Sequence, residues 1–323
     1  MQRALRLAEQ AQGWTSPNPM VGAILVKDGE RIGEGYHTKF GAAHAEVEAI
    51  KNATASPEGA TLYVTLEPCC HQGKTGPCTE AIIEAGISKV IVAVRDPSEK
   101  VSGKGIGALR EAGIEVEVGL LEKDARELNR FFFTYHEKKR PFVTLKAAIS
   151  LDGKIAEAPG EQTALTGMPA QRYLHGLRHE HQAILVGAGT VLTDNPHLGV
   201  RHVEGRDPLR VVLTGLRKLP KTLAIFRDEN VLLLSDKNIP KVLHELYEKE
   251  ITSVLVEGGQ KIFESFLAAQ LVDELQLFLA PTFLGKKAVP FAELKKPLHL
   301  KHVHTKTLGK DLLLQAIPEF SAE

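Results

Sequence analysis

The residues of this chain best suited to chemistry by type and spacing are His44, Glu46, Cys69 and Cys78. One imidazole and two thiolates would give zinc three protein ligands and leave a fourth tetrahedral position for water, as in catalytic zinc sites. A carboxylate two residues from a ligand could take a proton from that water and later deliver it to a leaving amine. The pattern predicts hydrolytic deamination, against the alternative of two buried thiols and a surface histidine.

The spacing of these residues makes a demand on local structure. Residues two apart on a helix point to nearly opposite sides, so His44 and Glu46 can serve one metal only if His44 starts the helix. Prolines 68 and 77 directly precede the two cysteines and mark breaks in regular structure. Cysteines near helix N-termini have low pKa values and ligate metals readily, which favours both thiols as metal ligands.

A longer loop than usual separates the two cysteines. Zinc deaminases carry H-x-E followed by P-C-x-x-C, whereas eight residues lie between Cys69 and Cys78. In this form residues 67–78 closely resemble the deaminase domain of the bifunctional riboflavin-biosynthesis deaminase/reductase family. The resemblance implies Zn²⁺ on His44, Cys69 and Cys78, with Glu46 as the catalytic residue. Cys70 stands where the family commonly has serine, and its role as bystander or ligand stays open.

Polar residues around this segment are expected to bind the deaminase substrate. His71 and Lys74 lie in the loop between the cysteines and favour a polar, charged substrate. The family resemblance implies that Asn18 and His37 contact a pyrimidine and that Asp96 helps to bind its sugar phosphate. For Asn18 the alternative is that it only holds a turn between two prolines. The deaminase substrate residues are therefore Asn18, His37, His71, Lys74 and Asp96.

The elements that position these groups follow from periodicity. We expect a helix from residue 4 that ends near Gly13 and a hairpin of residues 21–26 and 31–36 around Asp28. Helix and strand then alternate over residues 79–118, which predicts an α/β layered domain with a largely parallel sheet. The family resemblance implies that this is a cytidine-deaminase-like α/β/α layered domain. A further helix is expected over residues 120–135. Asp96 would follow a strand, where α/β sheets tend to hold ligands.

A charged run that ends at Pro141 marks the predicted domain boundary, with a deaminase domain over residues 1–138 and a reductase domain over residues 139–323. Residues 142–156 predict a buried strand followed by an Asp-Gly turn. Glycine-rich elements at residues 187–189 and 258–259 each follow an apolar strand and open a predicted helix. Such turns present backbone N–H groups to phosphates.

The second half as a whole resembles the reductase domain of the same family, whose fold is similar to dihydrofolate reductase. The matching stretches are residues 142–156, 184–190, 194–201 and 254–259. The resemblance implies that NADPH is held by Ala148, Thr190, Asp194, Gly259, Gln260, Lys261, Ile262, Phe263, Glu264 and Ser265. It implies that the reductase substrate is faced by Lys146, Gln162, Arg178, Leu198, Arg201 and Glu257. Gln162 stands where the family commonly has serine, and Ala164 where it commonly has tryptophan.

Composition limits the class of protein. The 323 residues suffice for two domains, and 40 basic against 40 acidic residues give a formal net charge of +0. No overall field favours nucleic acid or an anionic membrane. Only three cysteines occur, two of them assigned to zinc, and no signal peptide or membrane span is evident. We expect a cytoplasmic enzyme of a small molecule, and the resemblance implies a homo-oligomer, a dimer or tetramer.

The prediction is a bifunctional enzyme of riboflavin synthesis. Its first domain would deaminate 2,5-diamino-6-(5-phosphoribosylamino)pyrimidin-4-one, and its second would reduce the ribosyl group to the ribitylamino-uracil 5-phosphate with NADPH. One alternative is a zinc deaminase of another nucleotide or of tRNA with an inactive second domain, although the neutral charge weighs against nucleic acid. Another is a zinc-stabilised scaffold without activity, against which Glu46, a non-ligand, is the main evidence.

Overall fold

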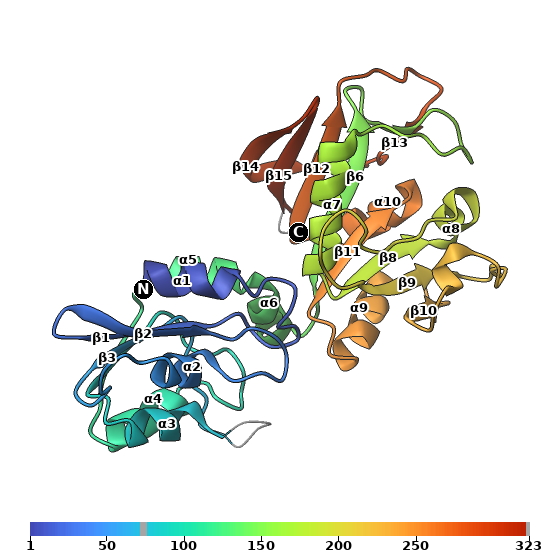
Figure 1. Ribbon diagram of the computed structural model, residues 1–323. Helices are drawn as coiled ribbons and strands as arrows, with labels where there is room; N and C mark the ends of the chain where they lie inside the picture. Colours follow the sequence, from blue (N-terminus) through green and yellow to red (C-terminus); the bar gives the residue numbers. More distant parts are fainter. Residues whose placement is uncertain (72–75, 321–323) are drawn as a thin grey trace. The chain divides into compact units, whose positions relative to one another are not determined.

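The break in periodicity before Pro141 separates two folding units, Met1–Lys138 and Lys139–Glu323. We call them the first and second units (Figure 1). The computed structural model describes residues 1–71 and 76–320. Each unit has its own sheet and its own apolar core. Among the described residues, no helix combines the length and the apolar character that a membrane span needs.

The first unit is built on a five-stranded sheet in the order β2-β1-β3-β4-β5. Its strands are β1 Gly22–Lys27, β2 Glu30–Tyr36, β3 Thr61–Val64, β4 Lys89–Val92 and β5 Glu115–Val118. The predicted hairpin is confirmed, because β1 and β2 pair antiparallel. The strands β3, β4 and β5 are parallel, as alternation with helices requires. Only β1 runs the other way, because it pairs antiparallel with β3 as well as with β2, so the expectation of a largely parallel sheet is confirmed for four of the five strands.

Helices cover both faces of this sheet. Figure 1 shows one layer formed by α1 Gln2–Glu9, α5 Glu122–Leu128 and α6 Arg130–Lys138, and the other by α2 Ala45–Lys51, α3 Cys78–Glu84 and α4 Lys104–Glu111. The second layer packs on the strands through small and branched side chains such as Ala49, Ile82 and Leu109. The first layer packs through Leu5 and Phe133. The predicted α/β/α layering is confirmed.

The helix expected over residues 120–135 is broken at Asn129, and the first helix ends at Glu9 instead of near Gly13. Asn129 is only 3% exposed. Its side-chain Oδ1 accepts from the Met20 N–H at 2.8 Å, and its Nδ2 donates to the Met20 carbonyl at 2.9 Å. This amide bridge serves residues far away in the sequence, so helical periodicity gave no sign of the break.

The second unit contains an eight-stranded sheet in the order β10-β9-β8-β11-β6-β12-β15-β14. The six strands from β10 to β12 are parallel, and β15 and β14 are added antiparallel. Their bounds are β6 Phe142–Ser150, β8 Ala183–Gly187, β9 Leu209–Leu213, β10 Val231–Leu234, β11 Ser253–Gly258, β12 Glu274–Ala280, β14 His299–Leu308 and β15 Asp311–Glu319. A small ladder joins β7 Lys154–Ala156 to β13 Val289–Pro290.

Helices again lie on both faces of this sheet (Figure 1). They are α7 Met168–Glu180, α8 Ala188–Asp194, α9 Ile239–Glu248 and α10 Gln260–Ala268, with a short 3₁₀ turn at Ala224–Phe226. The helices α9 and α10 bury Leu246 and Phe266 on one face, and α7 buries Leu177 on the other. Both predicted strand-glycine-helix junctions are confirmed, because Gly187 precedes α8 and Gly259 precedes α10. The carboxyl ends of the parallel strands therefore share one edge.

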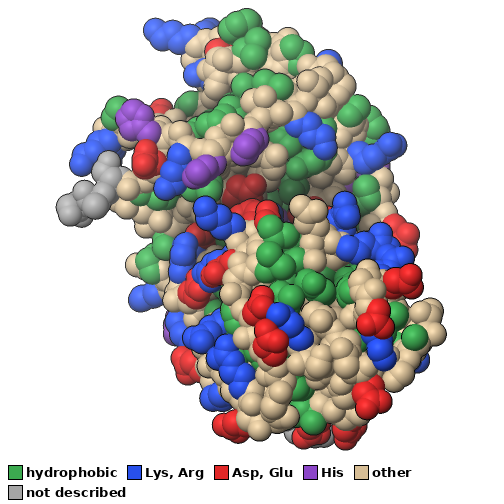
Figure 2. Space-filling view, turned by 90° about the vertical axis from the view of Figure 1, so that its left-hand side faces the viewer, with side chains coloured by type: hydrophobic (Ala, Val, Ile, Leu, Met, Phe, Trp, Pro, Cys, Tyr) green, Lys and Arg blue, Asp and Glu red, His purple; other side chains and the backbone are tan. Residues whose placement is uncertain are grey.

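The edge strand β14 is exposed along nearly its whole length. Figure 2 shows histidine and basic side chains gathered over this edge of the second unit. They belong to a strand whose exposed side chains include His299, Lys301, His302, His304 and Lys306. The register with β15 shifts between Lys301 and His304. Charged side chains and a bulge are the usual means by which an edge strand avoids pairing with another chain.

Two glycines of α4 provide a matched test of packing against the segment that carries Cys69. A Cβ at Gly105 would lie 2.0 Å from the Pro68 carbonyl oxygen, whereas a Cβ at Gly107 would meet nothing within 4 Å. We expect Gly105→Ala to lower the free energy of unfolding by about 1–3 kcal/mol through overpacking. Gly107→Ala should raise it by about 0.5–1 kcal/mol through helix propensity. The free energies of unfolding can be measured by thermal and denaturant unfolding. Equal changes in the two variants would contradict this packing.

Candidate functional site

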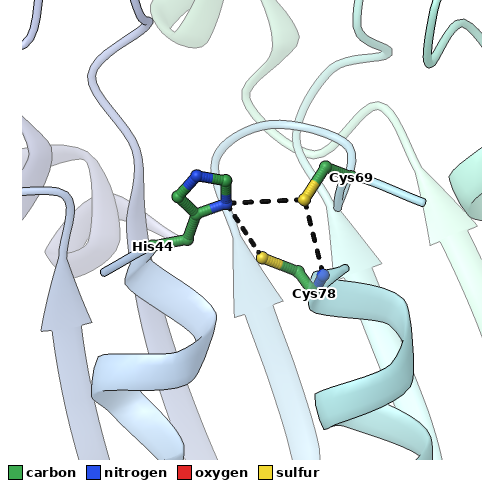
Figure 3. Close-up of side chains that lie close together, drawn as sticks. All are labelled: His44, Cys69 and Cys78. Atoms are coloured by element: carbon green, nitrogen blue, oxygen red, sulfur yellow. Dashed lines mark hydrogen bonds between the residues drawn. The ribbon is translucent and has the colours of Figure 1, made fainter. Parts of the chain in front are cut away.

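Three donor atoms of the first unit converge at one point (Figure 3). His44 Nδ1 lies 3.1 Å from Cys78 Sγ and 3.4 Å from Cys69 Sγ. One nitrogen and one sulfur on a tetrahedral zinc would be roughly 3.6 Å apart, given usual Zn–N and Zn–S bond lengths. Among the described residues, this is the only group of three or more His, Cys, Asp or Glu side chains with ligand atoms clustered closely enough for a metal. The donors fit zinc.

Helix starts place these donors. His44 is the N-cap of α2, with an extended backbone at φ −77° and ψ 159°, so the expectation that it starts the helix is confirmed. Cys78 is the first residue of α3, directly after the N-cap Pro77. Cys69 follows β3 and is held from α3, because the Cys78 N–H donates to its sulfur at 3.4 Å and the Thr79 N–H to its carbonyl at 3.1 Å.

The protonation of the two thiols differs. A hydrogen bond from the Cys78 thiol, with further support from His44, lowers the pKa of Cys69 to about 4. The same hydrogen bond and burial raise the pKa of Cys78. Cys69 is therefore available as a thiolate, the form that binds metal. Cys70 is half-buried beside it and is absent from the donor cluster, which contains His44, Cys69 and Cys78.

Glu46 lies in the first turn of α2 and is only 3% exposed. Burial and the neighbouring Cys69 raise its pKa, while the hydrogen bond with Cys78 has the opposite effect. A raised pKa makes a carboxylate a better proton acceptor, as a general base requires. Glu46 thus lies at the donor cluster without being part of it.

A cavity of about 330 Å³ opens beside the donor cluster. Its walls include His44, Glu46 and Cys69, together with four of the five residues predicted to bind the deaminase substrate, Asn18, His37, His71 and Asp96. The fifth, Lys74, lies outside the described residues. Asn18 Nδ2 is 3.4 Å from His37 Nε2, and His37 Nδ1 is 3.1 Å from the Ala43 carbonyl. Because a carbonyl only accepts, Nδ1 carries the proton and Nε2 is an acceptor.

Sequence reasoning missed part of this cavity. Phe132 and His136 of α6 line it, and their rings are in contact with a centroid distance of 4.5 Å. Phe40, Ser98, Lys100 and Val101 also lie on its walls. The α6 residues are far from the metal motif along the chain, and no local pattern marks them. Only the packing of α6 in the layer above the sheet brings them to the site.

Glu67 is a second residue that sequence reasoning did not single out. Its carboxylate is 3% exposed and accepts three backbone N–H bonds, from Asp96 at 3.2 Å, Gly103 at 3.0 Å and Ile106 at 3.1 Å. It therefore ties the loop that carries Asp96 and the start of α4 to the strand end that carries Cys69. Asp96 is fixed further by the Ser98 N–H, which donates to its Oδ1 at 2.7 Å.

In the second unit, three residues predicted to face the reductase substrate interact. Arg178 of α7 and Glu257 of β11 form a two-pronged ion pair at 2.7 and 2.8 Å, with both side chains less than a tenth exposed. Burial alone would raise the pKa of Glu257, but Arg178 holds it below its ordinary value. Burial lowers the pKa of Lys146, against the influence of Glu257. An amine with a lowered pKa beside an ion pair is suited to proton transfer.

The loop after α8 joins this group. Arg178 Nη1 donates to the Gly199 carbonyl at 3.1 Å, next to the buried Leu198. The Arg201 N–H donates to His175 Nδ1 at 2.9 Å. Burial, and then the charge of Arg178, lower the pKa of His175 to about 4, so its ring is a neutral acceptor. Gln162, by contrast, is exposed in the loop between β7 and α7.

Two of the residues predicted to hold NADPH, Thr190 and Gly259, lie close together at the shared carboxyl edge. Thr190 Oγ1 donates to the Gly258 carbonyl at 3.2 Å, and a Cβ at Gly259 would lie 2.9 Å from that hydroxyl. Gly258 and Gly259 have φ of 104° and 90°, which only glycine adopts easily. We call the open space at Gly258 and Gly259 the glycine cradle. A Cβ would fill it, and without one it suits a phosphate group. Asp194 lies one turn after Thr190 on α8, and Phe263 is a core residue, so only its backbone can face a ligand.

Two family models match the chain. The RibD C-terminal domain matches residues 141–314. The cytidine and deoxycytidylate deaminase zinc-binding region matches residues 1–94. Together they cover the two regions in which the donor cluster and the glycine cradle lie.

Relatives match over nearly the whole chain. The riboflavin biosynthesis protein RibD of Aquifex aeolicus is 42% identical, over 97% of this chain and 96% of its own length. The protein of the same name from Bacillus amyloliquefaciens is 41% identical, over 99% and 95%. Among solved structures, Acinetobacter baumannii RibD matches with a TM-score of 0.95 at 37% identity, over 99% and 98%. A diaminohydroxyphosphoribosylaminopyrimidine deaminase/5-amino-6-(5-phosphoribosylamino)uracil reductase from Thermotoga maritima matches with a TM-score of 0.87 at 40% identity, over 98% and 97%.

The three hydrogen bonds of Glu67 lead to a prediction about the first unit. In Glu67→Gln an amide group would face backbone N–H donors, so we expect a loss of about 1–3 kcal/mol in the free energy of unfolding. Because Asp96 would lose its support, the KM of the deaminase substrate should rise while zinc content stays unchanged. Glu115→Gln, at an exposed ion pair with Lys89, is the control and should behave like the wild type. Equal stability and equal KM in the two variants would exclude this role for Glu67.

Proposed function

The chain belongs to the RibD family, the bifunctional deaminase and reductase of riboflavin biosynthesis, and from this premise we propose which residues carry each reaction. The observation that carries the proposal is the convergence of His44, Cys69 and Cys78 beside the buried Glu46, at the wall of a cavity. The first unit acts on 2,5-diamino-6-(5-phosphoribosylamino)pyrimidin-4-one, and the second acts on the deaminated product.

In the deaminase site, His44, Cys69 and Cys78 hold zinc, which when bound supplies the Lewis acidity that makes water nucleophilic near neutral pH. Glu46 accepts the proton that this water loses on attack at the ring carbon bearing the 2-amino group. It then returns the proton to that nitrogen, which leaves as ammonia. Its burial supports this role, since a shielded carboxyl group exchanges protons with the substrate rather than with bulk water.

The polar walls of the cavity orient the pyrimidine. His37 offers Nε2 as an acceptor beside the Asn18 amide, so the pair can recognise both a donor and an acceptor on a ring edge. Asp96 contacts the sugar portion, and His71 and Lys74 bind the phosphate. This arrangement discriminates against substrates that lack matching polar groups, because their partners would be left unpaired.

In the reductase site, Ala148, Thr190, Asp194 and the turn from Gly259 to Ser265 hold NADPH, which supplies the hydride when bound. The hydride goes to C1′ of the opened ribosylamine. Lys146, whose pKa is lowered by burial, donates a proton to the attached nitrogen. Arg178 and Glu257 fix the position of Lys146 and of the substrate, with Leu198, Arg201 and Gln162 as further substrate contacts.

Two features of the whole protein belong to the same proposal. A homo-oligomer, dimer or tetramer, is proposed from the family resemblance. A cytoplasmic location is proposed because all three cysteines are free.

Separate sites predict separable defects. Glu46→Gln should lower ammonia release by about 10²–10⁴-fold through the loss of proton transfer. It should leave NADPH oxidation with pre-deaminated substrate unchanged. Asp194→Ala should show the reverse pattern, with NADPH oxidation impaired and ammonia release intact. Both activities are measured on each purified, zinc-loaded variant, with circular dichroism as the control for folding.

Loss of both activities in either folded variant would refute independent sites. If zinc removal unfolded the protein while Glu46→Gln left every activity unchanged, the metal would be structural and Glu46 would have no catalytic role.

A further inference from the structure

The strand order of the second unit indicates which way the dinucleotide lies along the carboxyl edge of the sheet. Lys146 lies on β6 and Glu257 on β11, whereas Thr190 opens α8 after β8. Beyond them lie β9 and β10, on the side away from the residues that face the substrate. From β6 to β9 there are three strand spacings, roughly 14 Å. A dinucleotide whose nicotinamide lies at β6 and whose phosphates lie at Thr190 and Gly259 therefore brings its adenosine to the loops after β9 and β10.

Arg217 is on the loop after β9, and its side chain extends toward the glycine cradle. Its Nη1 would lie 3.5 Å from a Cβ built on Gly189, the residue next to Thr190. The loop itself is held in place, since the Arg217 N–H donates to the Thr214 carbonyl at 3.1 Å. Thr214 in turn bonds to the Leu234 carbonyl of β10 through its N–H at 2.8 Å and through its hydroxyl at 3.1 Å. The guanidinium is thus carried by an anchored turn.

Lys237, on the loop after β10, folds over the same turn. A Cβ at Gly215 would lie 2.4 Å from Lys237 Cε and 2.9 Å from its Nζ. Gly215 has φ of 56°, and any larger residue there would displace the lysine side chain. The absence of a side chain at Gly215 therefore leaves room for Lys237 over the turn that carries Arg217, whose guanidinium extends to Gly189.

The charge around this turn is positive. In the ranges 1–71 and 76–320, Arg217 and Lys237 take part in no salt bridge, and Lys218 adds a third cation. Asp236, the acid next to Lys237 in the sequence, is already engaged. Its Oδ1 accepts from the Asn238 N–H at 2.8 Å, and its Oδ2 is 3.8 Å from Lys241 Nζ.

We propose that Arg217 and Lys237 bind the 2′-phosphate of the cofactor and thereby make the second unit select NADPH over NADH. This inference rests on the proposed reductase site. A 2′-phosphate is a dianion, and guanidinium and ammonium groups are the side chains that bind phosphate best. NADH has hydroxyl groups only on that ribose, so it gains nothing from the two cations. The pair is therefore a specificity determinant that takes no part in hydride transfer.

The test is cofactor binding by the full-length protein, measured through the fluorescence of NADPH and NADH and by thermal shift, without substrate. For Arg217→Gln/Lys237→Gln we expect the Kd of NADPH to rise about 10- to 100-fold, as for the loss of charge-assisted hydrogen bonds. The Kd of NADH should stay unchanged. Lys249→Gln removes one positive charge at the opposite end of α9 and serves as the matched control. In the wild type, 2′,5′-ADP should displace NADPH and 5′-ADP should not. The double variant should lose this displacement by 2′,5′-ADP.

The outcomes separate this inference from the proposed function. If the double variant keeps the NADPH preference, or weakens NADPH and NADH equally, Arg217 and Lys237 do not bind the 2′-phosphate, and the reductase site stands. If the wild type binds neither cofactor, the reductase half of the proposed function fails and takes this inference with it. A Gly215→Ser variant adds a second measurement, since displacing Lys237 should weaken NADPH binding selectively while the protein stays folded.

Discussion

The structure of the first unit depends on the buried carboxylate of Glu67. It accepts backbone N–H groups from three residues that lie in two different segments, a loop and the start of a helix. Two residues later the chain provides Cys69, so the same short stretch fixes a metal donor, the Asp96 loop and the position of α4. A buried carboxylate is stable only when its oxygens are fully bonded. The deaminase site can therefore keep its shape only if all three contacts form together.

The two units apply one structural rule to different chemistry. In both, functional residues follow the carboxyl ends of parallel strands. A helix start or a glycine then lets the chain approach a ligand closely. In the first unit His44 and Cys78 lie at helix starts, and their side chains act as donors. In the second unit Gly258 and Gly259 remove side chains, so that a phosphate can approach the backbone. The first unit thus offers donor atoms to a metal, and the second offers space for the phosphate of a cofactor.

Much of this arrangement could be predicted from sequence because its signals are local. The hairpin, the helix start at His44 and the strand-glycine-helix junctions each depend on residues a few positions apart. What sequence reasoning missed depends on contacts across the fold. Asn129 breaks a helix because it bonds to Met20, and His136 reaches the cavity only through the packing of α6. The same holds for Arg217 and Lys237, which lie on the loops after the neighbouring strands β9 and β10 and belong to no motif.

The most direct test of two coupled activities uses the wild-type protein with zinc, the diaminopyrimidine ribosylamine phosphate and NADPH. Ammonia release and the loss of nicotinamide absorbance are followed together in one sample. We expect both signals, with oxidation delayed until deaminated product has formed. Ammonia without oxidation would contradict the reductase half of the account. Oxidation that begins before any ammonia appears would contradict the order of the two reactions, and the absence of both signals while zinc stays bound would contradict the substrate.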